Sequence, residues 1–334
     1  SGGRFSFYNR MQKRSAYLFA SFVVLSCGVF ASLAKGQNNY DLGGLAGAPT
    51  RMGFGARGIG MANAFSAVRS DEVTGYYNPA LVPFQTHPTA MIAVGFLPLD
   101  RNLNFVSYSQ SLRPSGGVSV GIINAGVSNL EGRNRDGLVT DTYSTSENEF
   151  LLSFGIKVAD KVAVGVSAKI FYYSLFEGVA STTVGFDLGL VYTLDDQWTV
   201  GLVIHDINSK YKWDTSQLYG REGNTTIDRF PLRRKIGVAY SPGFLNAAVA
   251  GELEWIGSAW LTRIGTEIHL HEQFSIRGGV DQVSFAGDIT AKPSFGFSLR
   301  APIELLKPVL HYSYVIEPYS PGGIHMLSLN LNFQ

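Results

Sequence analysis

Hydrophobic and polar residues alternate along most of the chain after residue 88. Successive side chains of a β-strand point to opposite faces, so a period of two predicts strands that are apolar on one face only. In the segment 183–193, for example, Phe186 and Leu188 fall on one face and Asp187 on the other. The same pattern predicts about fourteen strands, at residues 89–97, 101–110, 116–126, 147–158, 161–174, 183–193, 197–207, 231–241, 246–256, 261–270, 273–281, 293–301, 308–316 and 325–333.

The connections between these strands alternate in length. Short turns, such as Ala159-Asp160 and His271-Glu272, alternate with long polar stretches at residues 127–146, 208–230, 282–292 and 317–324. Short turns at the periplasmic end and long loops at the outer end are typical of outer-membrane barrels. An even number of antiparallel strands also lets the sheet close, which leaves no unpaired edge in lipid. The sequence therefore predicts an all-β fold, a transmembrane antiparallel β-barrel of about 14 strands, over residues 89–334.

The N-terminal segment has the pattern of an export signal. Basic Lys13 and Arg14 follow Met11, an apolar run covers residues 16–33, and small residues surround Lys35 just before Gln37. This order of basic, apolar and small residues is that of a secretory signal peptide. A transmembrane anchor is the alternative, although the run is short for one. We therefore expect residues 1–36 to contain upstream residues and a cleaved signal peptide, and the mature chain to reside in the bacterial outer membrane.

Composition agrees with a barrel and excludes several other classes. Charged residues make up 16% of the chain, against about 25% in typical soluble proteins. After the N-terminal segment no run of about 20 apolar residues occurs, which argues against a helical membrane protein. Removing residues 1–36 takes away five basic residues and no acidic one, which leaves a formal charge of −4. Because no basic stripe remains, we expect no nucleic-acid partner.

Residues 37–88 do not alternate, and they are rich in Gly and other small residues. Gly permits close backbone approach and Asn-Pro favours a fixed turn, so we expect this segment to form a plug inside the barrel, with one short helix near residues 59–68. Within it, an Ala-Arg pair, a Gly-Met pair, an acidic pair and an aromatic-Asn-Pro-Ala sequence follow one another, carried by Arg57, Gly60, Met61, Asp71, Glu72, Tyr77, Asn78 and Pro79.

These motifs resemble the N-terminal signature of the PorV/PorQ family, which belongs to the wider FadL-like group of outer-membrane barrels. With the strands that follow, the resemblance covers the whole mature chain. It implies an accessory barrel of the type IX secretion system that handles or anchors cargo at the outer membrane.

Charged residues of both signs fall on the face of the strands that would point into the barrel. The candidates for polar lumen residues are Lys157, Lys169, Asp187, His205, Arg263, Glu267 and Arg277. Unpaired charges are costly in a dry interior, so these residues predict a lumen that is hydrated or filled by the plug. Two interpretations stay open: the charges only hold the plug, with Arg57 and Asp71 or Glu72 as its partners, or they line a path for a substrate.

Two further features concern the outer end of the barrel. The stretch 208–230 contains aromatic and Arg residues of the kind that anchor protein interfaces, namely Tyr211, Trp213, Tyr219 and Arg221. In the third strand the apolar pattern breaks at Asn124 and Gly126. A polar, Gly-containing break can mark a bulge or kink, and in FadL-like barrels a kink there opens a lateral exit.

No catalytic, cofactor-binding or metal-binding motif stands out, so we expect neither an enzyme nor a bound cofactor. The principal hypothesis is the secretion role implied by the PorV/PorQ resemblance, with secreted cargo or secretion proteins as partners. The alternative is a FadL-like transporter of hydrophobic small molecules across the outer membrane. A structural barrel with a small diffusion pore is a third hypothesis.

Overall fold

The computed structural model describes residues 43–333, apart from residues 71, 73, 177, 243–245, 284–288 and 304–305. The predicted signal peptide and Asp71 of the predicted plug motif therefore lie outside the described residues.

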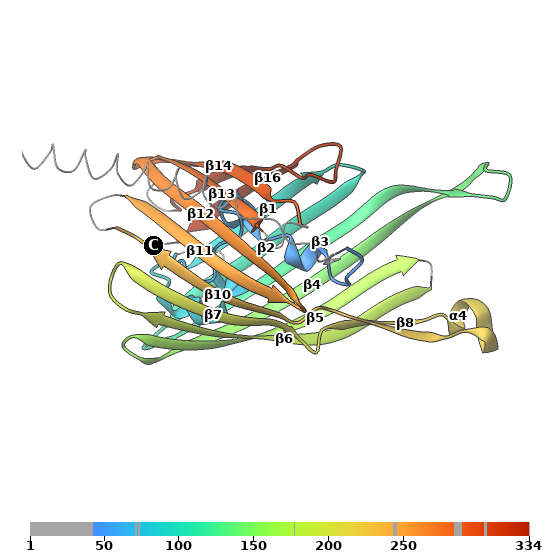
Figure 1. Ribbon diagram of the computed structural model, residues 1–334, viewed down its shortest axis with the longest axis horizontal. Coiled ribbons are helices and arrows are strands. Elements are labelled where there is room, and N and C mark those ends of the chain that lie inside the picture. The colour runs from blue at the N-terminus through green and yellow to red at the C-terminus, as the bar shows by residue number, and fades with distance from the viewer. Residues whose placement is uncertain are drawn as a thin grey trace, which may run out of the picture.

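Fourteen strands form a closed antiparallel barrel, which confirms the predicted fold (Figure 1). Each strand pairs with its neighbour in sequence, except that β7 pairs with β10, and β1 pairs with β16 to close the sheet. The strands are β1 (Thr89–Leu97), β2 (Arg101–Leu112), β3 (Gly116–Arg133), β4 (Val139–Ala159), β5 (Val162–Phe176), β6 (Val179–Thr193), β7 (Trp198–Ile207), β10 (Arg233–Tyr240), β11 (Ala247–Ile256), β12 (Ala259–His271), β13 (Phe274–Val283), β14 (Lys292–Arg300), β15 (Val309–Val315) and β16 (Ile324–Asn332).

The outer surface of the barrel is apolar, as the alternation predicts. In β1, Ile92 and Phe96 are 53% and 56% exposed, whereas Met91 and Ala93 on the opposite face are buried. The outward row of large apolar side chains matches the hydrocarbon of a bilayer, and the inward row meets the plug. Among the described residues, no helix is long and apolar enough to cross a membrane.

The two ends of the barrel differ. At one end the strands are joined by tight turns such as the one at Asp195, whose carboxylate accepts hydrogen bonds from the main-chain N–H groups of Gln197 and Trp198. Such side-chain caps of main-chain N–H groups favour short turns. At the other end β3 and β4 rise beyond their neighbours as a long hairpin (Figure 1). We call the long-loop end the outer end and the short-turn end the periplasmic end, after the usual orientation of outer-membrane barrels.

The predicted loop at 127–146 is largely strand, and the predicted loop at 208–230 contains a two-stranded sheet, so this part of the prediction was wrong. β3 and β4 continue through most of 127–146, and β8 (Lys210–Asp214) and β9 (Thr225–Arg229) form a separate two-stranded sheet. Two short helices, α4 (Ser216–Tyr219) and η3 (Gly220–Glu222), connect β8 to β9. Most side chains on both faces of the β3–β4 extension are exposed, so its strands lack the apolar alternation that reveals a transmembrane strand, whereas β8 buries one face.

The predicted kink in the third strand is also absent at its predicted place. β3 pairs with β2 without interruption through Asn124 and Gly126. Asn124 instead bridges neighbouring strands, because its side chain hydrogen-bonds those of Asn104 and Asn148 at 3.3 and 2.8 Å. The apolar pattern therefore ends there because the strand leaves the hydrocarbon, and the register shift comes later, between Val127 and Leu130.

The segment that begins at residue 43 lies inside the barrel (Figure 1). It contains η1 (Pro49–Arg51), α2 (Gly55–Gly60), α3 (Thr74–Tyr77) and η2 (Pro79–Phe84). The helix predicted at 59–68 is α2, which begins earlier and ends at Gly60. It ends there because Ala62 and Asn63 adopt positive φ angles of 55° and 60°, which are incompatible with an α-helix.

Glycines of the barrel wall let the plug approach closely. A Cβ atom at Gly165 would lie 2.4 Å from the carbonyl carbon of Pro79, and one at Gly155 would lie 2.4 Å from the Pro79 oxygen. No side chain fits at either position, so η2 packs directly against the main chain of β4 and β5. Asn78 begins η2 by accepting a hydrogen bond from the Ala80 N–H group at 3.0 Å, and Pro79 occupies the first helical position.

Candidate functional site

The plug is fastened to the barrel by hydrogen bonds from its main chain. Serines of the wall bind α2 and the turn after it: Ser328 Oγ accepts from Ala56 N at 2.7 Å, and Ser294 Oγ accepts from Ala62 N at 3.1 Å. Asn78 donates to the carbonyl oxygen of Leu190 in β6 at 3.3 Å. The plug is thus held on opposite walls of the barrel, by α2 on β13–β16 and by η2 on β3–β6.

Met61 and Tyr77 of the plug motif are buried inside the plug. Met61 has no exposed surface, and Tyr77 is 1% exposed. The Tyr77 hydroxyl accepts a hydrogen bond from Phe54 N at 3.0 Å and donates to Asn63 Oδ1 at 2.9 Å. These residues therefore shape the plug and do not face a cavity themselves.

Charged side chains fill the lumen in three groups. The first surrounds Lys169, whose ammonium group lies 2.9 Å from Asp187, 3.1 Å from Asp206 and 3.5 Å from Glu149. Arg233 extends this group through Asp206 at 2.9 Å. His205 joins it through a 2.9 Å contact with Asp187.

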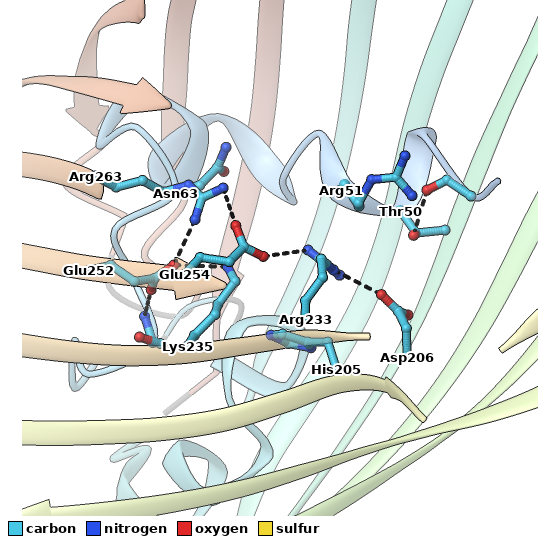
Figure 2. Close-up of polar contacts among 12 residues, drawn as sticks. Thr50, Arg51, Asn63, His205, Asp206, Arg233, Lys235, Glu252, Glu254 and Arg263 are labelled. Atoms are coloured by element: carbon cyan, nitrogen blue, oxygen red, sulfur yellow. Dashed lines mark hydrogen bonds and ion pairs between the residues drawn. The ribbon is translucent and has the colours of Figure 1, made fainter. Parts of the chain in front are cut away.

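The second group surrounds Arg263, which contacts Glu252, Glu254 and Asp281 at 3.3, 2.5 and 2.6 Å. Arg233 also approaches Glu254 at 3.6 Å and so links the first two groups (Figure 2). Lys235 completes this group with a 2.9 Å contact to Glu252.

The third group joins the plug to the barrel. Arg57 of α2 lies 2.7 Å from Glu267 and 3.5 Å from Glu72. Arg277 shares Glu267 at 2.9 Å, and His311 contacts Glu72 at 3.3 Å. Charges that are removed from water persist only with such partners, so these ion pairs make the position of the plug specific.

The structure thus places all the predicted lumen residues on the inner face of the barrel. Each of them belongs to one of the three groups, with the exception of Lys157. Lys157 lies near the periplasmic end, with its ammonium group 4.4 Å from the centre of the Phe84 ring. The groups also contain Asp206, Arg233, Glu149 and His311, which are not among the residues predicted from the sequence. The face of Arg233 and Glu149 follows from alternation, whereas Asp206 points inward beside His205 only because its φ of 64° accompanies a bulge between β6 and β7.

A vestibule of about 330 Å³ lies at the outer end of the lumen, above the plug. Its polar lining includes five cations, Arg51, Arg101, Arg233, Arg263 and Lys292, and three carboxylates, Glu254, Asp281 and Glu317, while its apolar lining comes from Leu45, Met52, Ile59, Leu103, Ile256, Leu261, Val315 and Ile324. Both the plug and the strand ends contribute, so the vestibule exists only while the plug is in place.

Two guanidinium groups in the vestibule lack a carboxylate partner. Arg51 donates to the carbonyl oxygens of Ala46 and Leu45, and Arg101 donates to that of Pro98 at 3.0 Å. Among the residues that the structure describes, no carboxylate forms an ion pair with either side chain. Burial, and next the charge of Arg233 (Figure 2), lower the pKa of Arg51 to about 10, so it remains a cation at neutral pH.

The predicted outer-loop contacts divide into two pairs. Tyr211 and Trp213 are only 2% and 9% exposed, because they pack with Phe171, Tyr173 and Phe230 on the inner side of β5. For these two residues the prediction of a free contact surface was wrong, since a strand and not a loop carries them. Tyr219, which is 65% exposed, and Arg221 do lie on the surface.

No group of three or more His, Cys, Asp or Glu residues suited to a metal ion occurs among the described residues.

Comparisons with known proteins agree at the level of fold. No protein-family model matches the sequence, and no curated protein matches it. Among solved structures, the CymD monoaromatic hydrocarbon channel has a TM-score of 0.60 at 13% identity, and the match covers 84% of this chain and 97% of that one.

Two other similar structures come from Pseudomonas species. The toluene transporter TodX of Pseudomonas putida has a TM-score of 0.59 at 13% identity, over 84% of this chain and 96% of that chain. A FadL homologue of Pseudomonas aeruginosa has a TM-score of 0.60 at 12% identity, over 84% and 98%. The PorV/PorQ resemblance stays a prediction, and the fold of this chain is that of the FadL-like outer-membrane barrels.

Proposed function

We propose that this protein takes up small hydrophobic molecules that carry one anionic group across the outer membrane. The vestibule is the observation that carries this proposal. Its apolar lining suits a hydrophobic body, and the unpaired guanidinium groups of Arg51 and Arg101 suit an anionic group. A guanidinium ion in a partly desolvated site binds a carboxylate or sulfonate through charge-assisted hydrogen bonds.

The fold supports the same class of function. Two barrels with this architecture are described as a monoaromatic hydrocarbon channel and a toluene transporter. Those descriptions concern hydrocarbons, and the two guanidinium groups without an ion-pair partner are what point to a charged substrate here. The proposal is therefore for transport of hydrophobic molecules, with the anionic group as a feature specific to this chain.

Binding of a charged aromatic probe tests the proposal. Purified protein in lipid nanodiscs is titrated with naphthalene-2-sulfonate and, for comparison, with a naphthyl trimethylammonium ion of similar size. We expect the sulfonate to bind at least about tenfold more tightly, because a hydrogen bond to a charged group contributes roughly 1.5–3 kcal/mol. The double variant Arg51→Gln, Arg101→Gln should lose this preference.

The matched control is Arg221→Gln, which removes an exposed arginine of the outer connection and should leave binding unchanged. Equal affinity for the two probes in the unmodified protein would overturn the anionic preference. Absence of binding for both would overturn the transport proposal itself.

A secretion role is the second candidate, and the hairpins favour it. The β3–β4 hairpin and the β8–β9 sheet extend past the rest of the barrel (Figure 1), and they present exposed side chains such as Tyr219. Affinity purification from the native membrane, followed by mass spectrometry, tests this role. Secreted proteins should be recovered with the intact barrel and lost when residues 216–222 are replaced by a Gly-Ser linker.

A further inference from the structure

Beneath the plug, a second set of cavities opens toward the periplasm. A cavity of about 40 Å³ is lined by Arg57 and Glu72 of the plug together with Glu267, His269, Ser298 and His311 of the wall. A groove of about 610 Å³ lies between the periplasmic turns. The cavity and the groove share His269, Glu272, Gln273 and Arg300 as lining residues, so they adjoin each other.

α2, the turn that follows it and the ion pairs of Arg57, Glu267 and Arg277 lie between this lower cavity and the vestibule. Ile59, Ala62 and Asn63 line the vestibule, whereas Arg57 lines the lower cavity. Both cavities border the same part of the wall, since Ser294 of β14 lines the upper cavity and Ser298 of the same strand lines the lower one. α2 and the turn after it thus form a partition between the two cavities. This partition lies against the mostly polar inner face of β13–β16.

The wall behind this partition is polar and incompletely satisfied. Ser313 Oγ and Arg277 Nε are buried and have no hydrogen-bond partner within the described part of the chain. Asn330 lies on the neighbouring strand β16, toward the periplasmic end. Its side-chain Oδ1 and Nδ2 atoms are also buried without a hydrogen-bond partner among the described residues. Buried polar groups without hydrogen-bond partners are uncommon in proteins. These atoms would find partners if the polar group of a solute moved along the wall.

We propose that solutes pass straight through the barrel along the polar inner wall of β13–β16, past α2, and leave through the periplasmic groove. This route rests on the proposed function and adds an exit to it. The exit also suits an anionic group, because Arg300 and Lys307 line the groove and Glu272 is its one acidic residue among the described positions. The lateral exit predicted at the third strand is closed, since β2, β3 and β4 pair without a gap through Asn124.

A reversible tether tests the route. A Cβ atom at Gly60 of α2 would lie 3.3 Å from Ser313 Cβ, close to the separation of about 3.5–4.5 Å found in disulfides, and 2.8 Å from Arg277 Cδ, so the flexible Arg277 side chain must shift. The double variant Gly60→Cys, Ser313→Cys is built together with Cys27→Ser, which removes the one native cysteine. Oxidation then ties α2 to β15, and reduction frees it in the same protein sample.

The measurement is the release of naphthalene-2-sulfonate from proteoliposomes. We expect release to fall at least about tenfold on oxidation and to recover on reduction, while binding of the probe at the vestibule is retained in both states. The single variants Gly60→Cys and Ser313→Cys are controls and should not respond to oxidant. Full release from the oxidised, tethered protein overturns the route, and so does binding without release in the reduced protein.

The exit is tested separately with Arg300→Gln, Lys307→Gln. We expect these changes to slow release of the sulfonate several-fold without weakening its binding. Lys161→Gln, which removes a cation from another periplasmic turn, is the matched control. Equal release from the exit variant and the unmodified protein overturns the assignment of the groove, whereas loss of binding in the unmodified protein would instead refute the proposed function.

Discussion

At the scale of single residues, Lys169 is the cation on which three buried carboxylates depend. It is 1% exposed and contacts Glu149, Asp187 and Asp206. Removing one partner from a buried ionic group leaves uncompensated charge, which typically costs about 3–5 kcal/mol. We therefore expect Lys169→Met to lower the free energy of unfolding by roughly that amount, as measured by urea-induced unfolding in lipid vesicles.

Lys161→Met provides the comparison for this prediction. Lys161 is exposed and donates to the carbonyl oxygen of Leu194, so its loss should change the free energy of unfolding by less than about 0.5 kcal/mol. Equal stability of the two variants would show that the carboxylates around Lys169 do not need its charge.

At the scale of elements, the contact between η2 and the wall depends on the absence of a side chain at Gly165. A Cβ there would lie 2.4 Å from Pro79 C, so Gly165→Ala must displace η2 from β4 and β5. We expect this variant to show a several-fold higher single-channel conductance in planar bilayers than the unmodified protein. Gly251→Ala should leave conductance unchanged, because no atom outside its chain neighbours lies within 4 Å of its Cβ position.

Most transmembrane strands could be predicted from alternation, because lipid on one side and the plug on the other impose opposite demands on successive residues. The alternation of apolar and polar residues ends where both faces of a strand meet water. The sequence therefore predicts a loop where the outer halves of β3 and β4 are strands. The short helix was misplaced for a different reason. The positive φ angles of Ala62 and Asn63, which end α2, arise from tertiary contacts with the wall.

The same limit applies to the candidate site. Alternation shows which charges point inward, and it placed Lys169, Asp187 and Arg263 in the lumen. It does not show which charges meet, because the pairing follows from strand register and from the bulge at Asp206. The vestibule depends on the N-terminal plug reaching the outer strand ends, and no local pattern in the sequence encodes that contact.

At the scale of the whole molecule, closure depends on the pairing of the first and last strands of the barrel. Ile92 of β1 lies opposite Leu329 of β16, and Cα atoms directly opposite each other in an antiparallel pair are about 4.5–5.5 Å apart. This separation permits a disulfide. We therefore expect Ile92→Cys, Leu329→Cys to form an internal crosslink under mild oxidation, detected by mass spectrometry of the intact chain after Cys27→Ser.

Ile92→Cys, Leu327→Cys is the control for that register, because Leu327 lies opposite Val94 and one step along the same face. Faster crosslinking in this control pair would place the seam in a different register and would alter the depth of every inward side chain on β16.

The β3–β4 hairpin is much longer than a strand needs to be to cross a membrane, so its tip lies away from the lipid. β4 has 21 residues, which at about 3.4 Å each makes a strand about 70 Å long. A barrel strand needs only about 10 residues to cross the hydrocarbon. The tip around Asn134 and Gly137 therefore lies well beyond the length that would cross the hydrocarbon. In an outer membrane with the usual orientation of such barrels, this tip would meet antibodies and bacteriophages before the rest of the barrel, so we expect sequence changes at the tip to leave the plug and its ion pairs undisturbed.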